Sequence, residues 1–372
     1  TKYYQYFINQ GFKDYKVFSN YGVILKNLGK LQDAELSYRK AIEIKPDYAE
    51  AHSNLGSILR DLGNLQDAEG YFRKAIELNP QYADAYTNMG NIMRDLGNLQ
   101  DAEKYYHKAI ELKPLDKNIK NNLINLLTIF KPKKINSNPL YVINEEFKKL
   151  NLSHKENFII SDNEAIKIYK DGLQLYKKYN LNLETNSSQI YKTNEDNFNC
   201  KRHKLIFNQH KIIPEFCFGC YKVQVEVDSI IELIKLFLVF NQLKLKNNNT
   251  RKSIIELRPN ISGFYKGLIY CLGLTEALEI SKKLNFQIQN NIRNNLISKV
   301  KRGCSEYPLK FPQYKEICTS GDQPMNYNEN WRIIEKEIDK SNREWSKSSN
   351  SIEGFSLNNF LVMRNWIAYA RK

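Results

Sequence analysis

The stretch DLGNLQDAE occupies residues 61–69 and recurs, letter for letter, at residues 95–103. A looser copy, NLGKLQDAE, stands at residues 27–35, again at an offset of 34 residues. The tetrapeptide KAIE follows each copy at the same spacing, at residues 40–43, 74–77 and 108–111. Self-similarity at a fixed period of this length indicates one supersecondary unit that is repeated and stacked. This repeat decides the fold of the first third of the chain.

Each copy has the residue pattern of two amphipathic helices with fixed ends. Two glycines stand seven residues apart, and the second suits the left-handed turn that ends a helix. Alanines mark the places where helix axes approach closely, and a proline stops the second helix. The glycines are Gly22, Gly56 and Gly90, then Gly29, Gly63 and Gly97; the alanines are Ala34, Ala68 and Ala102, then Ala41, Ala75 and Ala109; the prolines are Pro46, Pro80 and Pro114.

This pattern closely resembles the tetratricopeptide repeat, because that family's Gly, Ala, Tyr/Phe, Ala and Pro positions are all filled in residues 15–48, 49–82 and 83–116. The resemblance implies an all-α solenoid over residues 1–130. Residues 1–14 are similar to the second helix of an earlier, truncated repeat. Residues 117–130 are similar to a closing helix, in which Ile124 replaces the glycine. The chain begins at Thr1 rather than Met, as a fragment does.

One polar position recurs in the first helix of every repeat. Its residues are Asn20, Asn54, Asn88 and, in the closing helix, Asn122. A carboxamide has both donors and an acceptor, so a ladder of them can pair with successive backbone amides of an extended peptide. The ladder is most similar to the repeats of O-linked N-acetylglucosamine transferase, which use asparagines in this way. The alternative is that these residues face a neighbouring domain.

A second position, six residues later, is basic. It holds Lys26, Arg60 and Arg94, which suit acidic side chains or a C-terminal carboxylate. Because solenoids present extended concave binding surfaces, we expect the groove lined by the first helices to bind a protein or peptide. The transferase family's catalytic region is a large pair of nucleotide-sugar-binding domains. Residues 131–372 show no match to it, so the resemblance does not imply that activity here.

The two parts of the chain differ in charge. Of 56 basic and 41 acidic residues, 17 and 16 lie in residues 1–130, which leaves 39 and 25, a net charge of +14, for residues 131–372. The second part is therefore expected to attract an acidic partner. Its abundance of Lys, Asn and Ile is also what AT-rich genomes produce without selection on charge.

Composition excludes several classes of protein. With 26% charged and 12% aromatic residues, the chain is neither disordered nor collagen-like. No apolar run approaches the ~20 residues of a membrane helix, and no stretch has the basic-then-apolar pattern expected of a signal peptide. Six cysteines in a chain of this size do not form a disulfide framework. We expect a protein of the reducing cytoplasmic compartment that does not bind membranes.

The remaining chain is predicted to be a linker and helix at 131–160, a basic α+β domain at 161–320, and C-terminal helices at 321–372. In the α+β domain the expected order is strand, helix, strand, strand, helix, strand, which is that of a ferredoxin-like βαββαβ sandwich. The strands are expected at residues 223–227, 253–258, 265–271 and 296–300, with Asp228 and Thr275 as caps of the two helices. Further helices are expected at residues 139–150, 162–179, 328–343 and 356–371, and a short strand at 189–191.

Four side chains with metal-ligand chemistry precede the first of these strands. Cys200 and His203 form a C-x-x-H pair, and Cys217 and Cys220 form a C-x-x-C pair. Two chelating pairs are the ligand set that tetrahedral zinc prefers. This spacing predicts a structural zinc knuckle, with His210 as a substitute ligand.

Three other interpretations of the cysteines stay open. The thiols can be small buried hydrophobes. A redox dithiol is a second interpretation, although such motifs usually open a helix and this pair precedes a strand. An iron–sulfur cluster that adds Cys271, Cys304 or Cys318 is a third, without a familiar spacing to favour it.

Motifs for other chemistry are sparse. One RNA-binding module uses aromatics on the third strand of a ferredoxin-like sheet, but this strand keeps only the opening Gly263 and Phe264 of its signature. Nucleic acid is therefore the least favoured partner. Phosphate-loop, dinucleotide-binding, nucleophile-elbow and zincin motifs are absent. Arg258, Lys266 and Glu306 are candidates for a pocket, and equally ordinary strand-end and loop residues.

The sequence thus predicts a scaffold or adaptor whose repeats bind an extended segment of a partner protein, joined to a basic domain with a zinc knuckle. The main alternative is an enzyme, of a transferase or a metal or redox type, whose repeats recruit a protein substrate. No catalytic residue is identified for it. RNA binding by the basic domain is the second alternative.

Overall fold

The structure is a computed structural model that describes residues 4, 6, 10–11, 13–133, 138–150, 159–194, 200–259, 261, 263–319, 322–340, 347 and 349–371. The chain divides into two compact units. Unit 1 comprises Thr1–Leu126 and Asp339–Lys347, and unit 2 comprises Leu127–Ile338 and Ser348–Lys372.

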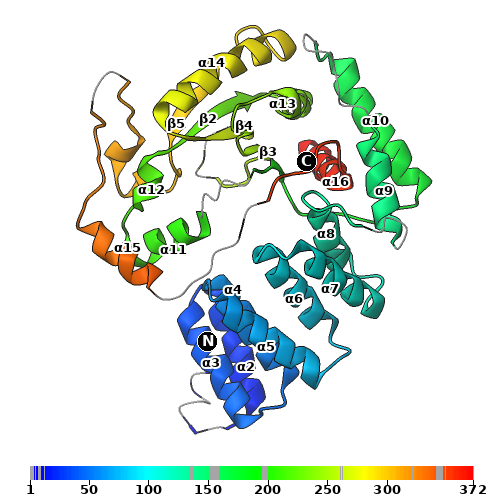
Figure 1. Ribbon diagram of the computed structural model, residues 1–372, viewed down its shortest axis with the longest axis vertical. Helices are drawn as coiled ribbons and strands as arrows, with labels where there is room; N and C mark the ends of the chain where they lie inside the picture. The colour runs from blue at the N-terminus through cyan, green and yellow to red at the C-terminus, as the bar shows by residue number, and fades with distance from the viewer. Residues whose placement is uncertain are drawn as a thin grey trace. The chain divides into compact units, whose positions relative to one another are not determined.

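Unit 1 is a stack of helical hairpins (Figure 1). The first helices of the hairpins, called A helices here, are α2 (Tyr15–Asn27), α4 (Ala49–Asp61), α6 (Ala83–Asp95) and α8 (Lys117–Leu126). The second helices, called B helices, are α3 (Leu31–Ile44), α5 (Leu65–Leu78) and α7 (Leu99–Leu112). Each B helix packs against its own A helix and the next one, and neighbouring A helices also contact one another.

Small residues allow the helices of one hairpin to lie close together. The six repeat alanines are fully buried. Gly90 of α6 lies against the ring of Tyr106 on α7, and a Cβ at residue 90 would come within 2.6 Å of that ring. Gly63 and Gly97, which end A helices, have φ of 87° and 85°, the left-handed conformation that the sequence predicted.

The predicted repeat helices are therefore confirmed, with one difference at the end of the stack. The closing helix was expected to reach residue 130, but α8 ends at Leu126 and a turn follows. Ile124, in place of the repeat glycine, is fully buried. Most of residues 1–14, the expected truncated repeat, lie outside the described residues.

Unit 2 contains a five-stranded antiparallel sheet in the order β1-β3-β4-β2-β5. Every neighbouring pair is antiparallel. The strands are β1 (Gln189–Lys192), β2 (Cys220–Val227), β3 (Arg251–Ile255), β4 (Tyr265–Leu272) and β5 (Lys299–Arg302). The short strand expected near residue 190 thus becomes an edge of the sheet.

Two long helices pack on one face of this sheet, α13 (Ile230–Gln242) and α14 (Leu274–Asn291) (Figure 1). Gly267 of β4 faces α13 so closely that a Cβ there would meet the ring of Phe240 at 2.6 Å. Successive side chains of a strand point to opposite faces, so the β4 residues at odd spacing from Gly267 point away from α13. The prediction of a helical repeat region followed by an α+β region is confirmed at this level.

A group of helices completes the core beside α13. These are α9 (Pro139–Lys148), α10 (Asp162–Lys178) and α16 (Leu357–Ala370). Phe360 of α16 lies 5.2 Å from Phe147 of α9 between ring centroids. Trp366 is fully buried, and its Nε1 donates a hydrogen bond to the carbonyl of Ser188 over 2.8 Å.

Several shorter elements precede β2 or follow β5 in the chain. They are α11 (Cys200–His210), α12 (Glu215–Phe218), α15 (Trp331–Asp339) and the 3-10 turns η2 (Tyr307–Leu309) and η3 (Pro312–Lys315). Among the described residues, no helix is long and apolar enough to span a bilayer.

Candidate functional site

The predicted asparagines occupy equivalent positions on successive A helices. Asn20 is exposed, and Asn54, Asn88 and Asn122 are half-buried. The Nδ2 of Asn88 on α6 donates a hydrogen bond to the Oγ of Ser53 on α4, 3.2 Å away. Because this bond joins two neighbouring A helices, Asn88 faces the A helix before its own. We call the surface that carries these asparagines the A-helix face.

The predicted basic residues lie on the same helices, and aspartates engage them. The Nζ of Lys26 lies 3.7 Å from a carboxylate oxygen of Asp61. The guanidinium nitrogens of Arg60 and Arg94 lie 3.9 and 3.5 Å from Asp95. The basic residues of the first two repeats thus each lie near an aspartate of the next repeat, whereas Arg94 lies near Asp95 of its own. Sequence reasoning missed Asp61 and Asp95, although the repeated DLG tripeptide was the signal for them.

These ion pairs are long and partly exposed. Charge-assisted N–H···O bonds are normally 2.7–2.9 Å long, and the side chains of Arg60 and Arg94 are about a quarter exposed. Partly exposed pairs of this kind contribute at most about 1 kcal/mol. A carboxylate from a partner can therefore compete with the aspartates for the basic residues.

The residues predicted to bind zinc lie in α11, α12 and β2, and each has other neighbours. His203 is buried, and its ring stacks on a phenylalanine with 5.1 Å between centroids. Cys217 is buried with its Sγ 3.3 Å from the hydroxyl of Tyr307. Cys220 is buried, whereas Cys200 is exposed. Among the residues that the structure describes, no three His, Cys, Asp or Glu side chains are grouped to hold a metal ion.

The environment of the buried thiols does not favour the thiolate that zinc requires. Burial is the main cause that raises the pKa of Cys220 to about 12, and it raises the pKa of Cys217 further. Cys304 packs against the cluster that contains Cys217 and Tyr307. His210, the predicted substitute ligand, is exposed at the end of α11. The structure therefore places Cys217 and Cys220 in desolvated surroundings, and zinc binding by the four predicted residues stays a prediction.

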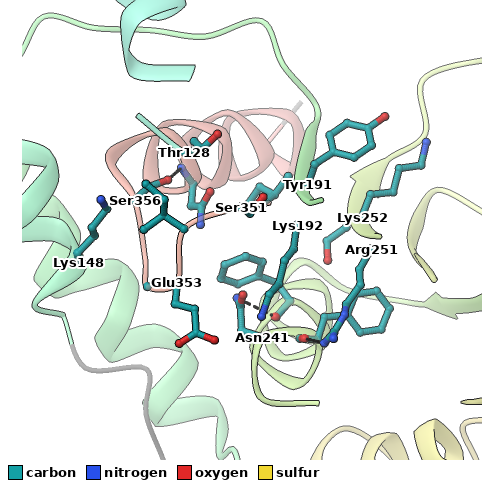
Figure 2. Close-up of a pocket in the computed structure, with 17 residues that line it drawn as sticks. Thr128, Lys148, Tyr191, Lys192, Asn241, Arg251, Lys252, Ser351, Glu353 and Ser356 are labelled. Carbon is teal, nitrogen blue, oxygen red and sulfur yellow. Dashed lines mark hydrogen bonds between the residues drawn. The ribbon is translucent and has the colours of Figure 1, made fainter. Parts of the chain in front are cut away.

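A pocket opens in unit 2 beside β1, β3, α13 and the start of α16 (Figure 2). The pocket is small, with a cavity volume of about 30 Å³. Lys192 extends into it, and burial, followed by the charge of Arg251, lowers the pKa of that lysine, while Glu353 opposes the shift. Sequence reasoning missed this pocket because its walls come from segments between Thr128 and Asn359.

Arg251, on the pocket wall, is almost completely buried, and no carboxylate of the described residues pairs with it. Its guanidinium donates to the carbonyls of Phe240 and Leu243, the latter over 2.6 Å. These carbonyls belong to the C-terminal end of α13, where the helix dipole favours a cation. Arg251 is therefore a structural cap of that helix.

Arg258, Lys266 and Glu306, the three polar candidates from the sequence, meet around Glu256. The Nζ of Lys266 lies 3.1 Å from Glu256, and both side chains are 4% exposed. Arg258 lies 2.8 Å from Glu256 and 2.8 Å from Glu306. The hydrogen bond from Arg258 is the main cause that lowers the pKa of Glu256 to about 2. The sequence did not indicate Glu256, which lies just beyond the end of β3.

Unit 1 has the geometry of a helical-hairpin solenoid, a class of protein built from stacked pairs of helices. Two family models match within it, one described as tetratricopeptide repeat over residues 47–114 and one as TPR repeat over residues 22–63. Residues 22–114 of this chain are thus matched by tetratricopeptide repeat models, and the match is confined to its N-terminal part. A comparison with curated proteins found no match.

Several solved tetratricopeptide repeat domains are similar to part of the chain. The first TPR of Spaghetti (RPAP3) bound to an HSP90 peptide is 26% identical, with a TM-score of 0.30, and the match covers 30% of this chain and 90% of that one. The first TPR domain of human RPAP3 is 27% identical, with a TM-score of 0.30 and coverages of 30% and 88%. The Arabidopsis OM64 TPR domain is 22% identical, with a TM-score of 0.29 and coverages of 30% and 93%.

Proposed function

We propose that this protein is an interaction scaffold whose A-helix face binds an extended segment of a partner protein. The observation that carries the proposal is the recurrence of an asparagine at one position of four successive A helices. The match of residues 22–114 to tetratricopeptide repeat models supports the same role, since such solenoids use their extended faces for binding.

Backbone recognition is the main source of affinity in this proposal. A carboxamide can donate to a peptide carbonyl and accept from a peptide N–H at once. In the part of the chain that the structure describes, Asn54 makes no hydrogen bond to another side chain, and Asn88 uses one donor on Ser53. The basic residues contribute less, because a partner's carboxylate must displace Asp61 or Asp95 to reach them. Binding should therefore tolerate many side chains and depend only moderately on salt.

Selection of a random peptide library on the full chain tests this proposal. Peptides retained by the native chain are measured again on an Asn54→Ala, Asn88→Ala variant by fluorescence anisotropy. Loss of two to four hydrogen bonds should weaken binding at least tenfold. The matched control is Gln66→Ala, Gln100→Ala, which removes two exposed carboxamides, also one repeat apart, from B helices.

Two results would contradict the proposal. One is that no peptide is enriched on the native chain over the control surface. The other is that the asparagine and glutamine variants bind every selected peptide equally well. Far-UV circular dichroism of both variants would establish that the helices persist.

For unit 2 we propose a ferredoxin-like sandwich with one added edge strand. We also propose that residues 131–160 form a linker and helix, residues 161–320 the central domain and residues 321–372 the C-terminal helices. The chain order β2-α13-β3-β4-α14-β5 and the sheet order β3-β4-β2-β5 support this classification. Strand β1 then extends the sheet beside β3.

A structural zinc ion held by Cys200, His203, Cys217 and Cys220 stays a proposal based on spacing alone. Metal analysis of the full chain purified without chelator tests it. About one zinc per chain, lost on Cys217→Ser, would support the knuckle. A metal-free chain would exclude it and favour the interpretation of Cys217 as a buried apolar residue.

A further inference from the structure

The sheet of unit 2 has a second face, turned away from α13 and α14, that the proposed function does not use. Gly267 points to α13, so Tyr270 of β4 points away from it. The strand register places Lys222 opposite Tyr270 and Lys301 opposite Lys222. It also places Tyr191 opposite Lys252. We call this surface the outer sheet face.

The close-up of the pocket confirms this alternation for two strands. Figure 2 shows Tyr191 and Lys252 pointing to one side of the sheet, while Lys192 and Arg251 point to the other. The register extends the same face across all five strands. Its charged strand residues are Lys222, Lys252, Lys266, Lys299, Lys301 and Glu226.

Most of this positive charge is not neutralised. Lys266 is paired with Glu256, and Lys301 lies 3.9 Å from Glu226. In the described part of the chain, Lys222, Lys252 and Lys299 make no ion pair. Burial, followed by the charges of Lys222 and Arg258, lowers the pKa of Lys252 to about 8. Like charges held close together in this way favour the binding of an anion.

Aromatic rings lie between these lysines. Lys252 sits over the ring of Tyr191 at 5.6 Å from the centroid, and Lys222 over that of Tyr270 at 5.3 Å. Tyr191 is 47% exposed. Tyrosine rings next to lysines on a sheet give a stacking platform for bases beside contacts for phosphates. This pairing of chemistries distinguishes the surface from a simple basic patch.

We propose that the outer sheet face binds single-stranded RNA, with a base stacked on the exposed ring of Tyr191 and phosphates held by Lys222, Lys252 and Lys301. A single strand is favoured over a duplex because the ring can stack only on an unpaired base. A strand is favoured over one nucleotide because Lys252 and Lys301 are three strand spacings apart, or about 14 Å.

The sequence ranked nucleic acid last because the third strand lacks the usual signature of an RNA-binding sheet. The register changes that ranking, since the platform here is built from β1 and β3 as well as β4 and β2. Cys200, at the start of α11, borders the face: Lys222 and Lys252 act to lower its pKa, against the larger raising effect of burial.

Fluorescence anisotropy of the full chain with a labelled single-stranded RNA 12-mer tests this proposal. Two lysine contacts removed by Lys222→Gln, Lys252→Gln should weaken binding at least tenfold and reduce the slope of log affinity against log salt by about 1.4. Tyr191→Leu should weaken binding by about tenfold through lost stacking. The matched control, Lys167→Gln, Lys170→Gln, removes two exposed lysines from α10 and should change affinity less than twofold.

Each other outcome overturns the proposal. No binding at low salt, or an equal loss in the α10 control, would leave only diffuse charge. Equal affinity for duplex RNA would exclude stacking. A mononucleotide that competes with the 12-mer and binds as tightly as it would indicate a small-nucleotide site instead. The Asn54→Ala, Asn88→Ala variant should bind RNA like the native chain, so failure of this proposal and failure of peptide binding are separable.

Discussion

Glu256 shows how a single side chain links the sheet to the behaviour of the protein in acid. It is buried beside Lys266 and accepts hydrogen bonds from Arg258. Its pKa falls from 4.5 to about 2 in the folded state. A carboxyl whose folded pKa is lowered stabilises the fold above its unfolded pKa, and this stability is lost as pH falls through the interval between the two values.

We therefore expect the unfolding free energy of the native chain to fall by about 2 kcal/mol between pH 4.5 and pH 2 as Glu256 is protonated. This value allows for solvent screening of the half-exposed Arg258. Glu256→Gln removes that dependence and lowers stability at neutral pH, because Lys266 is left buried without its carboxylate. Urea unfolding followed by tryptophan fluorescence across this pH range measures both effects. An unchanged pH profile in Glu256→Gln, or the same change in the exposed control Glu279→Gln, would contradict the assignment.

At the residue scale, the positions within a repeat could be predicted, whereas sites built from distant parts of the chain could not. Asn54 and Asn88 could be aligned because the offset of 34 residues fixes their place on the A helices. The surroundings of Glu256, of Cys304 and of the pocket could not be predicted, because their neighbours come from distant parts of the chain. Cys217 lies three residues from Cys220, yet spacing alone did not reveal that Tyr307 occupies its surroundings.

At the element scale, periodicity located the helices and strands, while side-chain competition set their ends. Asp228 was expected to cap α13, but Ser229 accepts from the N–H of Glu232 and Asp228 pairs with Arg293 instead. Thr275 was expected to cap α14, but the helix begins at Leu274 after Gly273, which has φ of 104°. The strand expected at 296–300 lies at Lys299–Arg302, where it pairs with β2. These shifts depend on partners that a local pattern does not contain.

Close packing within a hairpin gives a prediction for the repeat helices. Gly90→Ala should lower the unfolding free energy of unit 1 by about 1–2 kcal/mol. The added methyl meets the buried ring of Tyr106 at 2.6 Å, and overpacking of this kind outweighs the gain in helix propensity. Gly70→Ala is the matched control, because Gly70 is an exposed helical glycine with no atom within 4 Å of the new Cβ. It should stabilise the chain by about 0.5–1 kcal/mol.

Thermal unfolding followed by far-UV circular dichroism compares the two glycine variants directly. Opposite shifts of the helical transition are expected, downward for Gly90→Ala and upward for Gly70→Ala. Equal upward shifts would mean that the Tyr106 ring moves aside at little cost, and that the glycine is not required for close approach.

At the scale of the whole molecule, the repeat made unit 1 predictable from sequence, whereas unit 2 needed the structure. A period of 34 residues determines both the helices and their neighbours, because each hairpin packs on the next. In unit 2 the strand order β1-β3-β4-β2-β5 brings together residues that are far apart in the chain. The lysines and tyrosines of the outer sheet face align only once that order is known, which is why composition indicated charge without indicating a surface.

The two proposed surfaces lie in different units, which predicts how they respond to each other. The A-helix face and the outer sheet face share no residue, and each unit has its own buried core. Peptide binding and RNA binding should therefore be independent, with a saturating amount of one ligand changing the affinity for the other less than twofold. Coupling between sites is reciprocal, so anisotropy measured in both directions must give the same factor. Independence would be contradicted if each ligand changed the affinity for the other by fivefold or more, and if this effect were absent in the Lys222→Gln, Lys252→Gln variant. That result would show that the two binding sites are energetically coupled.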